Sequence, residues 1–84
     1  MYDITTRTKR VEKQYNRVVD DKIEKKLELL RQDPRRNLGA HKLKGKLKGL
    51  WSCWLESNLR MIYEIDDENK LIIAEAIGSH KIYL

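Results

Sequence analysis

The spacing of apolar residues changes along the chain, from a helical period in the first part to short apolar runs in the last. In residues 7–32, apolar positions recur every three or four residues, with Lys, Arg, Glu and Gln between them. The apolar positions are Val11, Tyr15, Val18, Val19, Ile23, Leu27 and Leu30. This period is typical of an amphipathic helix. One helix of about 25 residues would be about 37 Å long, so we predict two helices, divided near Asn16 or Asp20-Asp21, with an Asp capping the second.

The last third of the chain predicts a β-hairpin. Residues 59–65 and 71–77 are apolar runs rich in β-branched residues, and the polar residues 66–70 lie between them. Such runs around a loop of about five residues are typical of paired antiparallel strands. Because both runs are mostly apolar, we expect the hairpin to lie in the middle of a sheet.

The remaining segments complete an α+β pattern. Residues 2–6 predict a first strand, with Thr5 or Thr6 capping the first helix. Asp33-Pro34 ends the helical region, because proline disfavours helix at the residue before it. Residues 50–56 predict a strand, and Ser57-Asn58 a tight turn. We therefore predict a single domain over residues 1–84, in which an N-terminal strand and a helical hairpin pack on one face of a small antiparallel sheet.

Composition restricts the range of partners. Lys and Arg number 18 against 13 acidic residues, which gives a net charge of +5 and favours a polyanionic partner. Cys53 is the only cysteine, so neither an intrachain disulfide nor a cysteine-based zinc site is expected. The N-terminus lacks the apolar run of a signal peptide, and no stretch approaches the roughly 20 apolar residues of a membrane span. We expect a cytoplasmic protein without a membrane partner.

A basic segment follows the proline. Residues 35–48 contain no acid but six cations, Arg35, Arg36, Lys42, Lys44, Lys46 and Lys48. The last four alternate with Leu and Gly, which would place them on one side of an extended segment, although the glycines favour a loop. These cations and Lys81 are candidate RNA contacts, and the alternative is a solvated loop. Trp51 and Trp54 have opposite strand parity, so one is expected in the core and the other, Trp54, as a stacking surface for RNA.

Four residues are candidates for chemistry. His41 and His80 are suited to general acid–base catalysis, and Arg60 to stabilising charge on a phosphate. Tyr83 is suited to hydrogen bonding or stacking. Each has a structural alternative: a structural hydrogen bond for either histidine, an ion pair with Glu56 or Glu75 for Arg60, and packing on the sheet edge for Tyr83. No metal-ligand cluster is readable from the sequence.

The chain also resembles the RelE/ParE superfamily of bacterial and archaeal toxins from type II toxin–antitoxin systems. Four segments carry the resemblance: His41-Lys42-Leu43-x-Gly45-x-x-x-Gly49, Leu59-Arg60-Met61-Ile62-Tyr63-Glu64-Ile65-Asp66, Ile77-Gly78-x-His80 and Ile82-Tyr83. It implies a RelE-like fold and, for the RelE branch, cleavage of messenger RNA in the ribosomal A site without metal or cofactor. The ribose 2′-hydroxyl attacks the adjacent phosphate.

The resemblance also assigns roles by position. Arg60 matches the arginine that stabilises the scissile phosphate, His80 a candidate proton donor and Tyr83 the tyrosine that orients the RNA. His41 matches the histidine that opens the His-x-Leu-x-Gly motif of YafQ-like members. RelE proper has a pair of lysines on the strand before Arg60, whereas the corresponding region here is Trp51-Ser52-Cys53-Trp54. YafQ-like members have a second histidine and an aspartate where this chain has Trp54 and Asn58. The general base is left open between His41, Glu56 and a loop lysine.

Two other functions are compatible with these residues. One is a ParE-like inhibitor of DNA gyrase, and the other is a module that binds nucleic acid without cleaving it. The pairing of His80 with Tyr83 after Gly78 favours the nuclease. The resemblance further implies a cognate antitoxin with an acidic segment, mRNA and the ribosome as partners, and operator DNA contacted only through the toxin–antitoxin complex.

Overall fold

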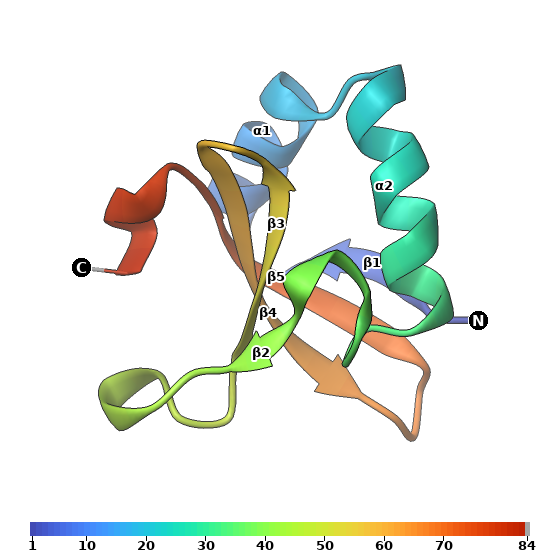
Figure 1. Cartoon of the computed structure of the whole chain (residues 1–84), viewed down its shortest axis with the longest axis vertical. Helices are drawn as coiled ribbons and strands as arrows, with labels where there is room; N and C mark the ends of the chain where they lie inside the picture. The colour runs from blue at the N-terminus through green and yellow to red at the C-terminus, as the bar shows by residue number, and fades with distance from the viewer. Residues whose placement is uncertain (84) are drawn as a thin grey trace.

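Two helices cover one face of a five-stranded sheet in the computed structural model, which describes residues 1–83 (Figure 1). The strands lie in the order β1-β5-β4-β3-β2. In chain order the elements are β1 (Asp3–Thr6), α1 (Lys9–Val18), α2 (Asp21–Gln32), β2 (His41–Lys42), β3 (Trp51–Glu56), β4 (Leu59–Asp66) and β5 (Leu71–Gly78), with short 3₁₀ turns η1 (Asn37–Gly39), η2 (Gly45–Leu47) and η3 (His80–Tyr83). The α+β class and the helical pair agree with the sequence prediction.

The helical hairpin has the predicted division but a different first cap. Asp20 caps α2, since its side chain accepts a hydrogen bond from the Ile23 amide. The prediction that Thr5 or Thr6 caps α1 is wrong: Thr8 does so, accepting from the Val11 amide at 3.2 Å. Thr5 and Thr6 are unavailable because both belong to β1 and pair with β5.

The β4–β5 hairpin lies at the centre of the sheet, as predicted. β2, β3, β4 and β5 are joined by antiparallel pairs. β1 departs from the predicted antiparallel sheet, because it pairs with the edge of β5 in parallel. The connection between β1 and β5 contains the helical hairpin and then β2, β3 and β4, so it is long enough for a parallel pair, which a tight turn cannot join.

The core lies between the helices and the sheet. α2 contributes Ile23, Leu27 and Leu30, all no more than 1% exposed. Cys53 of β3 and Tyr63 of β4 face them, fully buried. Burial raises the pKa of the Cys53 thiol to about 12, so Cys53 packs in the core as a small apolar residue. The Tyr63 hydroxyl donates to the Pro34 carbonyl at 2.6 Å and so ties β4 to the segment after α2.

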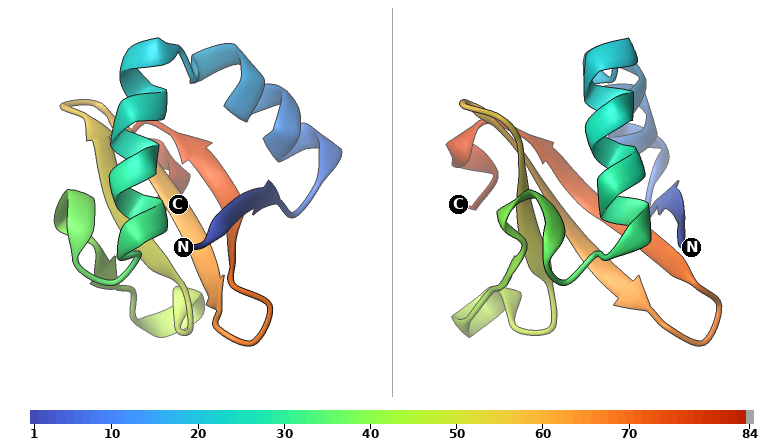
Figure 2. Two further views of the ribbon diagram at one scale, coloured as in Figure 1. Left: turned by 90° about the vertical axis from the view of Figure 1, so that its right-hand side faces the viewer. Right: turned by 45° about the vertical axis from the view of Figure 1, so that its right-hand side comes forward.

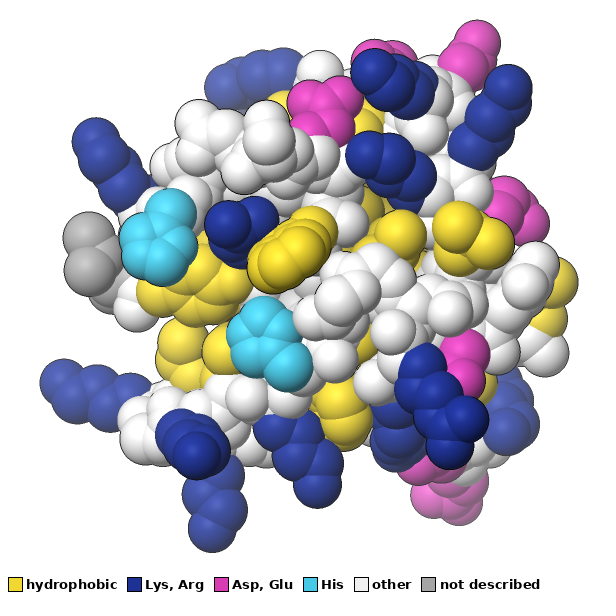
Figure 3. All heavy atoms as spheres, viewed as in Figure 1, with side chains coloured by type: hydrophobic (Ala, Val, Ile, Leu, Met, Phe, Trp, Pro, Cys, Tyr) yellow, Lys and Arg dark blue, Asp and Glu magenta, His cyan; other side chains and the backbone are white. Residues whose placement is uncertain are grey.

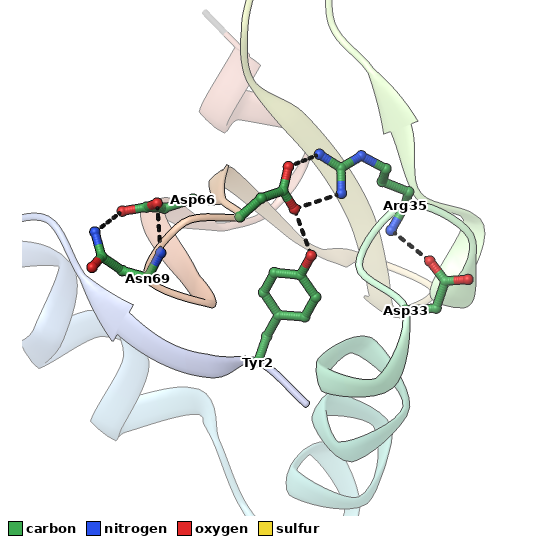
Figure 4. A network of polar contacts seen from close by, with 6 residues as sticks. Tyr2, Asp33, Arg35, Asp66 and Asn69 are labelled. Carbon is green, nitrogen blue, oxygen red and sulfur yellow. Dashed lines mark hydrogen bonds and ion pairs between the residues drawn. The ribbon is translucent and has the colours of Figure 1, made fainter.

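A polar cluster lies at the β4–β5 turn (Figure 4). Arg35 donates two hydrogen bonds to Asp67, at 3.0 and 2.7 Å, and the Tyr2 hydroxyl donates a third to that carboxylate. Arg35 therefore lowers the pKa of Asp67 to about 2. The cluster joins the N-terminus, the β4–β5 turn and the segment after α2.

The other face of the sheet is only partly open. Figure 2 shows the C-terminal turn on the side of the sheet away from the helices. There the hydroxyls of Tyr83 and Ser52 form a short hydrogen bond, and Ser52 is fully buried. In the part of the chain that the structure describes, neither helix is both long and apolar enough to cross a membrane.

Candidate active site

Five side chains from four segments line a shallow depression of about 380 Å³ on the open face of the sheet. They are His41, Trp54, Arg60, His80 and Tyr83. All four residues predicted as catalytic are thus together, with Trp54 beside them. Figure 3 shows both histidine side chains on one face of the molecule, with Lys and Arg side chains gathered around them.

The strand register explains why these residues meet. Trp54 of β3 and Arg60 of β4 are direct cross-strand partners, so their side chains point to the same face. On its other side Arg60 pairs with Gly78, the last residue of β5. The chain then turns back over the sheet as η3 and carries His80 and Tyr83 beside Arg60. Gly78 permits this return, since a Cβ at that position would lie only 2.9 Å from the Ile82 side chain.

Arg60 is available for an anion. The alternative of an ion pair with Glu56 or Glu75 is not observed among residues 1–83. Glu75 instead accepts from Arg7 at 2.7 Å, and the Arg60 guanidinium carbon lies 5.4 Å from the centre of the Trp54 ring. Trp54 is 55% exposed, whereas Trp51 packs against the core, as the strand parity predicted.

His41 is held by the backbone beside it. Its Nδ1 lies 3.0 Å from the carbonyl oxygen of Gly39. A carbonyl can only accept, so Nδ1 carries the proton and Nε2 of the neutral ring keeps a free lone pair. Of the three candidates for the general base, only His41 lines the depression, since Glu56 and the loop lysines lie outside it.

His80 and Tyr83 form a second pair. Their ring centres are 5.1 Å apart at an angle of 57°. His80 is exposed, but the Tyr83 hydroxyl is bound to Ser52. Ser52 and Gly39 thus fix two site residues, and our sequence interpretation missed both. The signal for Ser52 was a small polar residue within an apolar strand on the same parity as Trp54.

Apart from the two-residue strand β2 and the turns η1 and η2, the basic segment is a loop, as its glycines suggested, and most of it lies beside the depression rather than in it. Lys42, Lys44 and Lys48 line a separate hollow of about 400 Å³. Lys46 and Lys81 are exposed. Arg35 is bound to Asp67, and Arg36 is 87% exposed, 4.0 Å from Asp33. These positively charged side chains lie outside the depression that contains His80, and none of them lines it.

Comparison with known proteins agrees with this architecture. YafQ from E. coli matches with a TM-score of 0.67 at 22% identity, over 100% of this chain and 99% of that one. The toxin–antitoxin complex RelBE2 from Mycobacterium tuberculosis matches at 0.70 and 19% identity, covering 94% and 98%. A heterotetrameric YoeB–YefM toxin–antitoxin complex from Staphylococcus aureus matches at 0.71 and 25% identity, covering 95% and 98%. Curated protein sequences give no match.

The fold is therefore that of the RelE-like toxins. Residues 3–83 match the family described as the bacterial toxin of type II toxin–antitoxin systems, YafQ. The chain belongs to this YafQ toxin family.

Proposed function

We propose that this toxin is an endoribonuclease that cleaves messenger RNA on the ribosome and so arrests translation. The observation that carries the proposal is the single depression that contains two imidazoles, a guanidinium and a phenol. These are the groups that metal-independent phosphodiester cleavage requires: a base, an acid and a fixed positive charge.

The reaction assigns one role to each group. His41 Nε2 takes the proton of the ribose 2′-hydroxyl, and the 2′-oxygen attacks the adjacent phosphorus. The bond from phosphorus to the 5′-oxygen breaks, and His80 gives its proton to that oxygen. The products are a 2′,3′-cyclic phosphate and a free 5′-hydroxyl. Arg60 stabilises the negative charge that builds on the phosphoryl oxygens.

Tyr83 supports this chemistry by holding His80 in position. Because its hydroxyl is bound to Ser52, its ring is fixed against that of His80. The fixed Tyr83 ring keeps the His80 imidazole within reach of the leaving oxygen, which is the geometric requirement for proton transfer. In this proposal Tyr83 orients His80 and the RNA.

A cognate antitoxin completes the proposal. Two of the solved relatives are complexes of a toxin with its antitoxin. The net charge of +5 suits an acidic antitoxin segment that folds over the depression and blocks it. We expect this binding to weaken strongly as salt rises, and salt-independent binding would contradict the electrostatic part of the proposal. Operator DNA is contacted only through that complex.

The nuclease assignment is tested by inducing the chain in bacteria and following growth and transcript integrity. The wild type is expected to arrest growth and cleave transcripts, whereas an Arg60→Ala, His80→Ala double variant is expected to do neither. Arg10→Ala on the exposed surface of α1 is the matched control and should behave as the wild type. Arrest and cleavage that survive the double variant would refute the proposal. Gyrase-linked DNA breaks in arrested cells would instead support the gyrase inhibitor.

The general base is tested separately with His41→Ala in a defined translation extract. We expect cleavage at all sites to fall by about 10²–10⁴-fold, the usual contribution of general base catalysis. A loss of less than about tenfold would exclude His41 as the base.

A further inference from the structure

A second hollow, of about 540 Å³, adjoins the catalytic depression. The two share Trp54 and Arg60, and together their linings extend from the histidines to Ser57 in the turn between β3 and β4. The second hollow is completed by α2, η1 and the end of β3, which contribute Lys26, Leu38 and Glu56. Its volume lies within the range of small-molecule sites, about 300–1,000 Å³.

The walls of this hollow are fixed. The backbone of Gly39 runs along the Trp54 ring, where a Cβ on Gly39 would lie 3.5 Å from two indole atoms. Leu38, which packs against the core, has a φ of +57°, a left-handed conformation that is strained for a bulky residue. The surrounding packing must hold η1 in this conformation, so the apolar wall of Leu38 and Trp54 exists before any ligand binds.

Besides Arg60 and Ser57, the hollow is lined by a cationic donor, Lys26, and an anionic acceptor, Glu56, and no ion pair joins these two in the part of the chain that the structure describes. Lys26 is half-buried, and its ammonium donates to the Leu55 carbonyl at 2.7 Å, which holds it in place. Glu56 is exposed and takes part in none of the ion pairs or hydrogen bonds described for residues 1–83. A carboxylate in a basic groove repels the phosphates of a bound RNA, which Arg60 attracts. Glu56 is therefore suited to a different part of the RNA from the one that Arg60 binds.

We propose that this hollow reads guanine in a nucleotide that flanks the scissile phosphate. The inference rests on the proposed nuclease function and names part of its substrate. Guanine is the one RNA base whose Watson–Crick edge has two adjacent N–H donors, N1–H and the N2 amine, which a single carboxylate accepts together. The next group along that edge, the O6 oxygen, is an acceptor for Lys26. Leu38 and Trp54 contact the apolar faces and rim of the base, and Arg60 binds the phosphate between the two hollows.

The competing role for Glu56 is that of general base, and the two roles have different signatures. A base is needed for every bond that is cleaved, so its loss lowers cleavage uniformly. A reader of guanine matters only where guanine is present, so its loss lowers cleavage selectively and changes the sequence profile.

Binding is tested without any cleavage. Guanosine 3′,5′-bisphosphate and inosine 3′,5′-bisphosphate are titrated into the full chain, with the NMR signal of the Trp54 indole N–H as the readout. Inosine lacks only the N2 amine. We expect the guanosine ligand to bind about 10-fold or more tightly than the inosine ligand, since one charge-assisted hydrogen bond is lost. Glu56→Gln should abolish this preference, whereas Glu68→Gln in the β4–β5 turn should keep it. Equal affinities in the wild type, or a preference that survives Glu56→Gln, would overturn the proposal.

Specificity is then tested by mapping 5′-hydroxyl ends in a transcript pool cleaved in a translation extract. The wild type is expected to enrich guanine at one flanking position, and Glu56→Gln to remove that enrichment. A uniform loss of cleavage in Glu56→Gln would assign the general base to Glu56 and refute the reading role. Because the binding test involves no cleavage, failure of guanine recognition there is distinguishable from absence of nuclease activity here.

Discussion

The hydrogen bond from Tyr63 to the Pro34 carbonyl gives the sharpest test of how the fold supports the site. Tyr63 is fully buried and the bond is 2.6 Å long, which makes it the direct link between the central strand β4 and the segment that leads into η1. Tyr63→Phe keeps the ring but removes the donor, so the buried carbonyl loses its partner. An unsatisfied buried group costs about 1–3 kcal/mol. We therefore expect the free energy of unfolding to fall by about 2 kcal/mol.

The measurement is urea and thermal unfolding followed by far-UV circular dichroism. For a domain of this size, about 2 kcal/mol corresponds to a fall in Tm of about 8–16 °C, with an unchanged urea m-value. Tyr2→Phe is the matched control, because it removes the same hydroxyl from an exposed hydrogen bond to Asp67. We expect that change to cost less than about 0.5 kcal/mol. If both variants are equally stable, the buried bond does not hold η1 as we argue.

Three further outcomes follow from the core and the surface. Ile23→Val should cost about 1 kcal/mol in urea unfolding, because Ile23 is 1% exposed and a methylene-sized cavity remains; a neutral change would mean that the core collapses around it. Cys53, buried and with its pKa raised to about 12, should react with a disulfide exchange reagent only as fast as the chain unfolds, so rapid labelling at pH 8 without urea would contradict its burial. Because Arg35 lowers the pKa of Asp67 to about 2, below its unfolded value of about 3.9, their pairing stabilises the fold above about pH 4 and is lost as the pH falls towards 2. The stability difference between the wild type and Asp67→Asn should therefore shrink over that interval, and a constant difference would argue against the linkage.

The parts of the fold that the sequence predicted are those encoded by local patterns. The stripe through Ile23 and Leu27 predicts α2, the run of β-branched residues predicts the central hairpin, and Asp20 marks the second helix start. The parallel pairing of β1 with β5 was not predicted, because a four-residue strand has no local signal for its partner. The cap at Thr8 was missed for a related reason: Thr5 and Thr6, which we expected to cap α1, belong to β1.

The candidate site shows the same division. Strand parity and the resemblance to RelE-like toxins select Trp54 and Arg60, but the contacts that hold the site are between residues distant in sequence. Ser52 meets Tyr83 across 31 positions, and Gly39 meets Trp54 through a left-handed backbone that no apolar pattern encodes. Such contacts depend on the assembled sheet, so the sequence selects the candidate groups and the fold determines which contacts hold them in place.

The openness of the site bears on the proposed dependence on the ribosome. His41 and His80 are exposed, and Trp54 is more than half exposed, so charges at Arg60 act through water rather than a low dielectric. Electrostatic stabilisation of a phosphate is weak under these conditions and grows several-fold when water is excluded. In the chain alone, the described residues form a shallow depression with no lid over it. A rigid partner that presses the messenger against this face would exclude water and fix the 2′-hydroxyl near His41. In the proposed function, the ribosome thus supplies the exclusion of water and the positioning of the RNA that this open depression does not provide by itself.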